Sequence, residues 1–181
     1  MDYTANVRAT VERASADDWL AGAEWYRVAH ATAERLAADY RCSVDTAARV
    51  IAVLSPRKRW AENVAAAEIV LRAKRNRKGK PEIPGTLGAN LDKAWRIVSG
   101  DPDALRGPKV ERFYRNIMGD DTEVTLDVWA MRAAGSPLDA PNGERMYAII
   151  ADAYRAVARE YGIPVSALQA VAWIVVRGRA D

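Results

Sequence analysis

The sequence predicts an all-α protein folded as a single compact domain of several helices. Alanine is abundant, and the stretches rich in alanine and arginine carry few β-branched runs, a composition that favours helices over strands. Half of the 181 residues are apolar, which is enough for one full core at this length. No repeat is visible and no linker is long enough to divide the chain, so we expect one domain over residues 1–181.

Local signals mark the helices of the first half. A short helix comes first, and Ser15 is a good N-cap for a longer second one, because two aspartates follow it and complement the dipole of the first turn. Ser43 caps the third helix. The break at Ser55-Pro56 ends it, since proline disfavours a helical conformation at the residue before it. The expected helices are residues 3–14, 15–40, 43–54 and 60–75.

Glycine and proline separate the helices of the second half. Residues 76–85 form the clearest loop, and Thr86 is expected to cap a helix whose apolar residues recur at helical spacing. A glycine-proline turn precedes the next helix, and the stretch Gly162-Ile163-Pro164 separates the last two. The expected helices are residues 86–98, 109–118, 127–134, 142–161 and 164–177.

Charge and cysteine content limit the classes of protein to which this chain can belong. The formal net charge is +3, from 27 basic and 24 acidic residues, which permits a nucleic-acid partner without requiring one. Cys42 is the only cysteine and His30 the only histidine, so we expect no disulfide, iron–sulfur cluster, metal site or Ser-His-Asp triad. No signal peptide or membrane-spanning run is visible, which favours a reducing, cytoplasmic setting. No cofactor is expected, and the sequence carries no signal of an oligomeric state.

Lys109 and Asp127 are the leading candidates for chemistry. Lys109 lies in a glycine-proline turn at the start of one helix, and Asp127 is a lone carboxylate in an apolar run that starts the next. An amine can attack a sugar carbon, and a carboxylate can stabilise positive charge and move protons. The pair therefore suits chemistry at a sugar carbon if the two side chains face one another.

Three segments resemble the helix-hairpin-helix superfamily of DNA glycosylases, the group that contains endonuclease III and 8-oxoguanine glycosylase. The sequence VIAVLSPR at residues 50–57 resembles the helix that ends in the family's DNA-probing loop. The sequence GPKV at residues 107–110 resembles the second half of the hairpin, and LDVW at residues 126–129 resembles the segment with the catalytic aspartate. The resemblance covers residues 47–63 and 103–132, under a third of the chain.

The resemblance implies a base-flipping hydrolase that acts in base excision on double-stranded DNA. Asp127 would stabilise positive charge on the sugar after the glycosidic bond breaks, and Lys109 could form a Schiff base that permits strand cleavage. The Gly107 turn would place backbone N–H groups against a DNA phosphate. The residues expected to contact DNA are Gly107, Arg57, Lys58, Arg59, Trp60, Arg106 and Trp129, with the two tryptophans stacking on a base.

The chain also departs from the family pattern. Leu105 occupies the first glycine position of the hairpin, so the hairpin is degenerate, and Trp129 stands where the family has histidine. The iron–sulfur cysteines are absent. We therefore expect a distant, minimal member or a relative with altered chemistry. Segments 25–26, 54–57, 116–119 and 169–173 also resemble an uncharacterised group of phage-type proteins, whose setting would be the cytoplasm of a bacterial host.

Simpler interpretations stay open for each feature. Lys109 could be a phosphate contact or a solvated lysine, and Asp127 could be a helix N-cap, with Thr125 as its competitor. The cations at 57–59 could be a solvated charge run, and the six cations between residues 72 and 80 a flexible solvated loop. Two other functions remain: an enzyme that modifies a flipped base or nucleotide with a small co-substrate, and a non-catalytic DNA- or protein-binding module.

Overall fold

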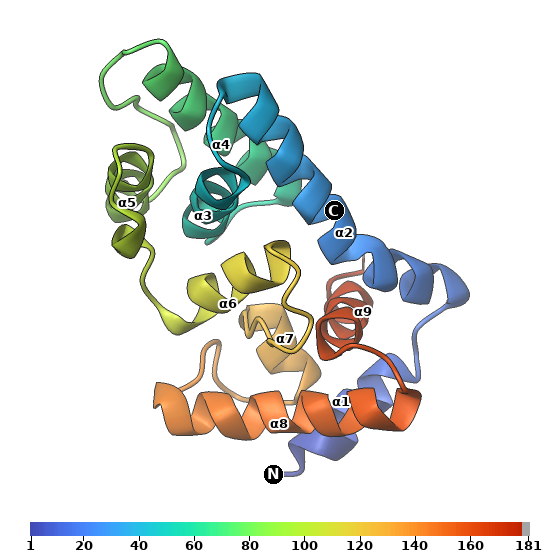
Figure 1. Ribbon diagram of the computed structural model, residues 1–181. Helices are drawn as coiled ribbons and strands as arrows, with labels where there is room; N and C mark the ends of the chain where they lie inside the picture. The colour runs from blue at the N-terminus through green and yellow to red at the C-terminus, as the bar shows by residue number, and fades with distance from the viewer. Residues whose placement is uncertain (179–181) are drawn as a thin grey trace. The chain divides into compact units, whose positions relative to one another are not determined.

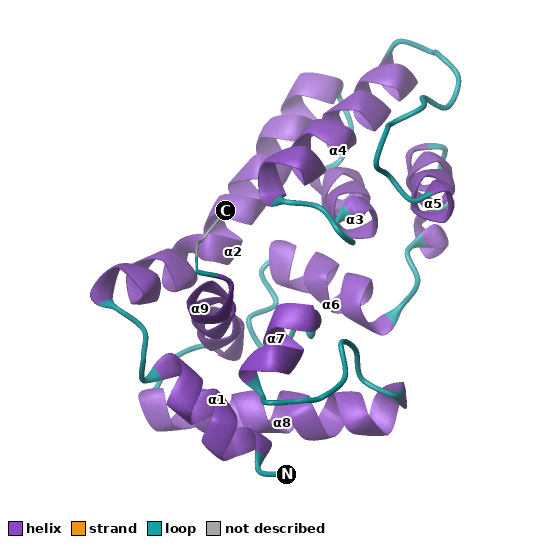
Figure 2. Cartoon of the chain, turned by 180° about the vertical axis from the view of Figure 1, so that it is seen from behind, coloured by secondary structure: helices purple, strands orange, loops and turns teal. Residues whose placement is uncertain are grey.

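The computed structural model describes residues 1–178, and within this part of the chain the only regular secondary structure is helical (Figure 2). The predicted all-α fold is confirmed. The chain groups into two compact units (Figure 1). Within the described residues, the terminal unit joins Met1–Val28 to residues 119–178, and the central unit is Ala29–Met118. The organisation of residues 1–181 as one domain stays a prediction.

The terminal unit surrounds an apolar core. It contains α1 (Tyr3–Val11), the first part of α2 (Ala16–Tyr40), α7 (Val128–Ala133), α8 (Gly143–Tyr161) and α9 (Val165–Arg177). Fully buried Leu126, Tyr154 and Leu168 belong to this core. Gly22 of α2 lies so close to α9 that an added Cβ would stand 2.4 Å from the Val171 side chain and 2.8 Å from its backbone nitrogen. Glycine is therefore required at this helix crossing.

The central unit is built around α3 (Val44–Leu54). It contains the rest of α2, α4 (Trp60–Arg75), α5 (Gly88–Val98), a short 3-10 helix η1 (Pro102–Ala104) and α6 (Pro108–Ile117). All five residues from Val50 to Leu54 are buried, and α3 packs on α4, α5 and α6. A helix that is apolar on every side at its C-terminal end belongs in the middle of a bundle.

Most of the predicted helix ends are confirmed. Ser15 and Ser43 act as N-caps: the hydroxyl of Ser15 accepts from the Asp18 N–H at 3.2 Å, and that of Ser43 accepts from the Thr46 N–H at 3.0 Å. The predicted cap at Thr86 is wrong, because the Thr86 N–H donates to Ile83 in a turn and α5 begins after Leu87. The 3-10 helix Pro102–Ala104 was not expected.

None of the helices in residues 1–178 is long and apolar enough to cross a bilayer. Over the same part of the chain, no group of three or more histidine, cysteine, aspartate and glutamate side chains is placed to hold a metal ion.

Candidate carboxylate site and nucleic-acid interface

Asp127 is the N-cap of α7, and both of its carboxylate oxygens accept hydrogen bonds. Oδ1 accepts from the backbone N–H groups of Trp129 at 3.0 Å and Ala130 at 2.9 Å. Oδ2 accepts from the indole N–H of Trp173 on α9 at 3.1 Å. The capping interpretation is therefore confirmed, and Thr125 is not the cap. Because the third donor comes from another helix, the half-buried carboxylate is held in one orientation.

Aromatic side chains of the terminal unit gather beside this carboxylate. The ring centroids of Trp173 and Trp25 lie 5.1 Å apart with the ring planes tilted by 38°, and the Arg177 guanidinium lies over Trp173 at 4.5 Å. The hydroxyl of Tyr26 donates to Oε1 of buried Gln169 at 2.8 Å. Gln169 and Trp173 lie one helical turn apart on α9 and bring a buried amide and an indole to the same neighbourhood.

Trp129 lies in the first turn of α7, and one face of its ring is covered. The guanidinium of Arg132 lies 4.7 Å from the ring centroid. A cation in this position is attracted to the electron-rich face of the indole. Stacking of a DNA base on that face would therefore require Arg132 to move.

The Asp127 charge affects two neighbouring phenols. Burial raises the pKa of Tyr26, and the negative charge of Asp127 adds to this, while a hydrogen bond with Thr125 acts in the opposite direction. Burial and the same charge raise the pKa of Tyr154, whose hydroxyl donates to the Ala130 carbonyl at 2.7 Å. Both phenols therefore stay neutral donors at ordinary pH.

The predicted hairpin turn lies in the central unit. Gly107 has a φ of 125° and is the N-cap of α6, with Lys109 half-buried in the first turn. The Gly107 N–H donates to Oε1 of Glu111 at 2.9 Å, and the amine of Lys93 donates to the Arg106 carbonyl at 3.3 Å. Glu111 thus places a negative charge where we expected a DNA phosphate. Lys109 belongs to the central unit and Asp127 to the terminal unit.

The predicted DNA-probing loop presents two of its three cations to solvent. Arg57 and Arg59 are exposed, whereas the amine of half-buried Lys58 donates to the Gly85 carbonyl at 3.3 Å. The Arg59 backbone N–H donates to Oε2 of Glu62 at 3.3 Å, and Trp60 begins α4. The sequence therefore identified an exposed basic loop, and the structure shows that Lys58 holds it against the loop before α5.

The basic stretch between Arg72 and Lys80 is attached to α5 at two points. The Lys74 ammonium lies 5.8 Å from the Trp95 ring centroid and donates to the Ser99 hydroxyl at 3.4 Å. Lys80 forms an ion pair with Asp92. All six cations of the stretch are exposed. These contacts give the stretch fixed anchors, in contrast to a freely solvated loop.

Charge is segregated between the two units. Residues 29–118 contain 18 basic and 10 acidic side chains, a formal charge of +8. Residues 1–28 and 119–178 contain 8 basic and 13 acidic side chains, a formal charge of −5. The whole-chain value of +3 conceals this difference. Counting charge by segment would have found it, but the segment boundaries come from the fold.

A polar network that sequence reasoning missed links α3 to α6. The Arg49 guanidinium donates to Asp45 at 2.8 Å and to the Tyr114 hydroxyl at 3.1 Å, and it lies 4.3 Å from the Tyr114 ring centroid. Tyr114 donates its hydroxyl hydrogen to Asp45. Burial alone would raise the pKa of Asp45, but the hydrogen bonds from Arg49 and Tyr114 and the Arg49 charge lower it below its ordinary value.

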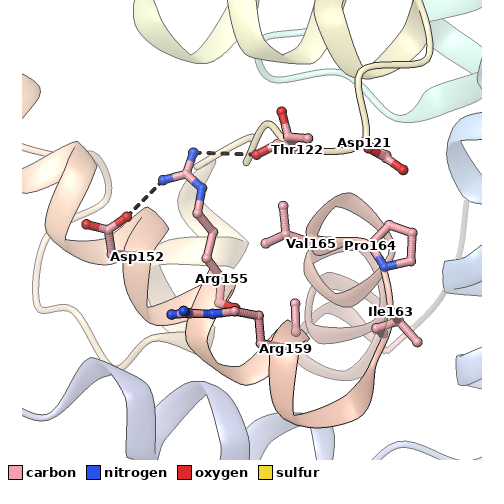
Figure 3. A pocket seen from close by; sticks show the side chains of 9 residues that line it. Asp121, Thr122, Asp152, Arg155, Arg159, Ile163, Pro164 and Val165 are labelled. Carbon is pink, nitrogen blue, oxygen red and sulfur yellow. Dashed lines mark hydrogen bonds and ion pairs between the residues drawn. The ribbon is translucent and has the colours of Figure 1, made fainter.

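A pocket of about 620 Å³ opens in the terminal unit beside the N-terminal end of α9 (Figure 3). Arg155 crosses it, donating to Asp152 at 3.0 Å and to the Thr122 carbonyl at 3.5 Å. Val165 and its neighbours give it an apolar side. Two arginines and two aspartates line it, so the lining favours neither charge of ligand.

Comparison with known proteins identifies a family but no activity. A protein-family model described as "Family of unknown function (DUF7178)" matches residues 1–180. No curated protein and no solved structure matches the chain.

Proposed function

The chain belongs to the DUF7178 family, a family of unknown function, and we propose that this member binds double-stranded DNA through its central unit. The charge of +8 on residues 29–118 carries the proposal. Positive side chains neutralise phosphates and release condensed counterions, which supplies most of the sequence-independent affinity for DNA. The charge of −5 on the rest of the chain would direct the duplex to the central unit.

The loop after α3 provides the first candidate contacts. Arg57 and Arg59 are exposed, and a guanidinium can donate two parallel hydrogen bonds to one phosphate. Lys58, through its bond to the Gly85 carbonyl, holds the loop that carries them. Arg106 and Lys109, in the turn before α6, are further candidates for phosphate contact. The acidic Glu111 makes the Gly107 N–H a weaker candidate.

The test measures affinity for a short labelled duplex as a function of salt. Wild-type protein should bind, and the logarithm of the association constant should fall linearly with the logarithm of salt concentration. The double variant Arg57→Ala/Arg59→Ala should reduce the steepness by about two, one for each lost phosphate contact. Arg13→Ala/Arg145→Ala removes the same charge from exposed positions of the terminal unit and serves as the control.

Three outcomes would contradict the proposal. These are no binding at low salt, an equal loss of affinity in the control variant, or a clear preference for RNA over duplex DNA.

A second candidate function is cleavage of a glycosidic bond in the bound DNA, with Asp127 as the essential carboxylate. The observation that favours it is the fixed, half-buried carboxylate bonded to Trp173, whose ring packs against that of Trp25. A negative charge that is already oriented stabilises a developing positive sugar charge without reorganisation. Aromatic rings suit contact with a flipped base. Lyase activity through Lys109 would be an addition to this reaction.

Asp127→Asn tests this candidate because asparagine is an equally good N-cap and should preserve α7. Base release from damaged or modified duplexes should disappear in Asp127→Asn while DNA affinity stays unchanged. Borohydride trapping on a duplex with an abasic site, with Lys109→Ala beside wild type, tests the Schiff base. A mass change on an intact base would instead indicate a modifying enzyme. No product from any duplex would indicate a binding module.

A further inference from the structure

Three arginines occupy a backbone conformation that the chain otherwise gives to glycine. Within residues 1–178, the non-glycine residues with positive φ are Arg41 at 53°, Arg57 at 63° and Arg77 at 53°. The positions with positive φ that hold glycine are Gly85, Gly100, Gly107, Gly119, Gly135, Gly143, Gly162 and Gly178. All three arginines are exposed and belong to the basic central unit.

This conformation is strained for arginine. A Cβ atom in the left-handed region crowds the following carbonyl oxygen, and glycine avoids the clash. Arg41 and Arg77 lie just beyond α2 and α4, where the Cys42 N–H donates to the Ala37 carbonyl at 3.1 Å and the Lys78 N–H to Ala73 at 2.9 Å. Such six-to-one hydrogen bonds close a helix end at which glycine is the usual residue. In the terminal unit, α8 and α9 do end at glycines.

Favourable interaction with the helix dipole does not explain why position 77 holds arginine and not glycine. Cations near the last carbonyls of a helix are stabilising, but Arg72, Lys74 and Arg75 already occupy the last turn of α4 in unstrained helical conformations. Strained residues that persist on a surface are a recognised sign of a functional constraint. A requirement for the side chain itself would explain why glycine is not used at these positions.

Two of these arginines lie at one end of the central unit. The central-unit part of α2 runs beside α4, with Arg35 bonded to Glu68 at 2.9 Å, and both helices have their C-terminal ends on the same side (Figures 1 and 2). Arg41 and Arg77 follow those ends. Arg41 precedes α3 and Arg57 follows it, so the length of this eleven-residue helix, about 16 Å, separates them. The strained arginines thus mark both ends of α3.

We propose that Arg41, Arg57 and Arg77 are direct contacts to the phosphates of duplex DNA, so that the duplex engages both ends of α3. This inference rests on the proposed DNA binding and deepens it by assigning the residues. A guanidinium on an exposed turn can approach a phosphate with both of its terminal nitrogens. The exposed cations of residues 72–80 surround Arg77 and add to the positive potential there.

The test replaces each arginine with glycine. Because glycine fits the left-handed conformation, Arg41→Gly, Arg57→Gly and Arg77→Gly should keep or raise the midpoint of thermal unfolding. The same variants should bind a short labelled duplex more weakly, with the slope of log affinity against log salt reduced by about one for each contact. Unchanged or higher stability together with weaker binding is a combination that a purely structural arginine would not produce.

Two control variants distinguish the loss of a phosphate contact from the loss of a positive charge and from the effect of backbone strain. Arg145→Ala removes one exposed positive charge from the terminal unit and should leave the salt slope unchanged. Gly162→Arg introduces a strained arginine at the C-terminal end of α8, where φ is 65°, and should lower stability without raising affinity for DNA.

Three outcomes would separate the role of the arginines from DNA binding itself. If Arg41→Gly and Arg77→Gly bind as tightly as a DNA-binding wild type, the inference is overturned and the proposed function stays in place. Glycine variants that unfold at lower temperature would show that the arginines stabilise the fold, which also overturns it. A wild type that shows no salt-dependent binding would overturn the proposed function itself.

Discussion

The indole N–H of Trp173 donates to Oδ2 of Asp127 across 3.1 Å, and this bond joins α9 to the N-terminal end of α7. The two residues are 46 positions apart in the chain. The capping bonds to Trp129 and Ala130 use only Oδ1, so Trp173 determines the orientation of the second oxygen. The Asp127 carboxylate therefore caps α7 and also accepts a hydrogen bond from α9. These bonds connect the N-terminal end of α7 to α9 within the terminal unit.

Trp173→Phe should lower the free energy of unfolding by about 1 to 2 kcal/mol, because it removes the donor to a charged acceptor while keeping an aromatic ring. Denaturant unfolding measures the change. Combining it with Asp127→Asn in a double-mutant cycle isolates the bond: the two effects should be less than additive. Strictly additive effects would mean that the N–H···O bond contributes nothing to stability.

Tyr147→Phe should cost about 1 to 3 kcal/mol, because two buried backbone groups lose their partner. The Tyr147 hydroxyl donates to the Val124 carbonyl at 2.7 Å and accepts from the Leu126 N–H at 3.0 Å, which holds the extended segment leading into Asp127. Urea unfolding at neutral pH checks the value. Wild-type stability in Tyr147→Phe would contradict this role.

Gly22→Ala should destabilise the protein by about 1 to 3 kcal/mol, because the new methyl group would meet the backbone of Val171. Gly88→Ala is the matched control. Gly88 is the first residue of α5, and an added Cβ there meets nothing within 4 Å. The two variants should differ clearly in their thermal midpoints, and equal midpoints would exclude a close crossing of α2 and α9.

The Asp45 network should make stability depend on pH in the acid range. A carboxyl whose pKa is lower in the folded state contributes stability that is fully present above its unfolded pKa and is lost as pH falls through its folded pKa. The stability difference between wild type and Asp45→Asn should therefore be constant near neutral pH and shrink below about pH 4, the ordinary aspartate value. The effect should be small because the Asp45 side chain is 42% exposed.

Unfolding free energies of both proteins across this pH range provide the measurement. A difference that grows as the solution becomes more acidic would contradict the lowered pKa of Asp45.

The helices were predictable where their signals are local. Ser43 caps α3 and Ser55-Pro56 ends it, and both features act within a few residues of the helix. The prediction failed at Thr86, because a turn to Ile83 fixes the Thr86 backbone and moves the start of α5 to Gly88. A hydroxyl next to a helix start is a signal of a cap, but the turn before it decides which residue takes that position.

The sequence is sufficient to predict the all-α class, the approximate limits of the helices, and the basic segments at 57–59 and 72–80. These follow from composition, apolar periodicity and capping, which act over one or two helical turns. The folded structure was needed to show that Trp173 orients Asp127, that Glu111 accepts a hydrogen bond from the Gly107 N–H, and that positive charge is concentrated in the central unit. The charge of each unit depends on which segments pack together. That packing buries apolar surface between distant parts of the chain, which has no local signature in the sequence.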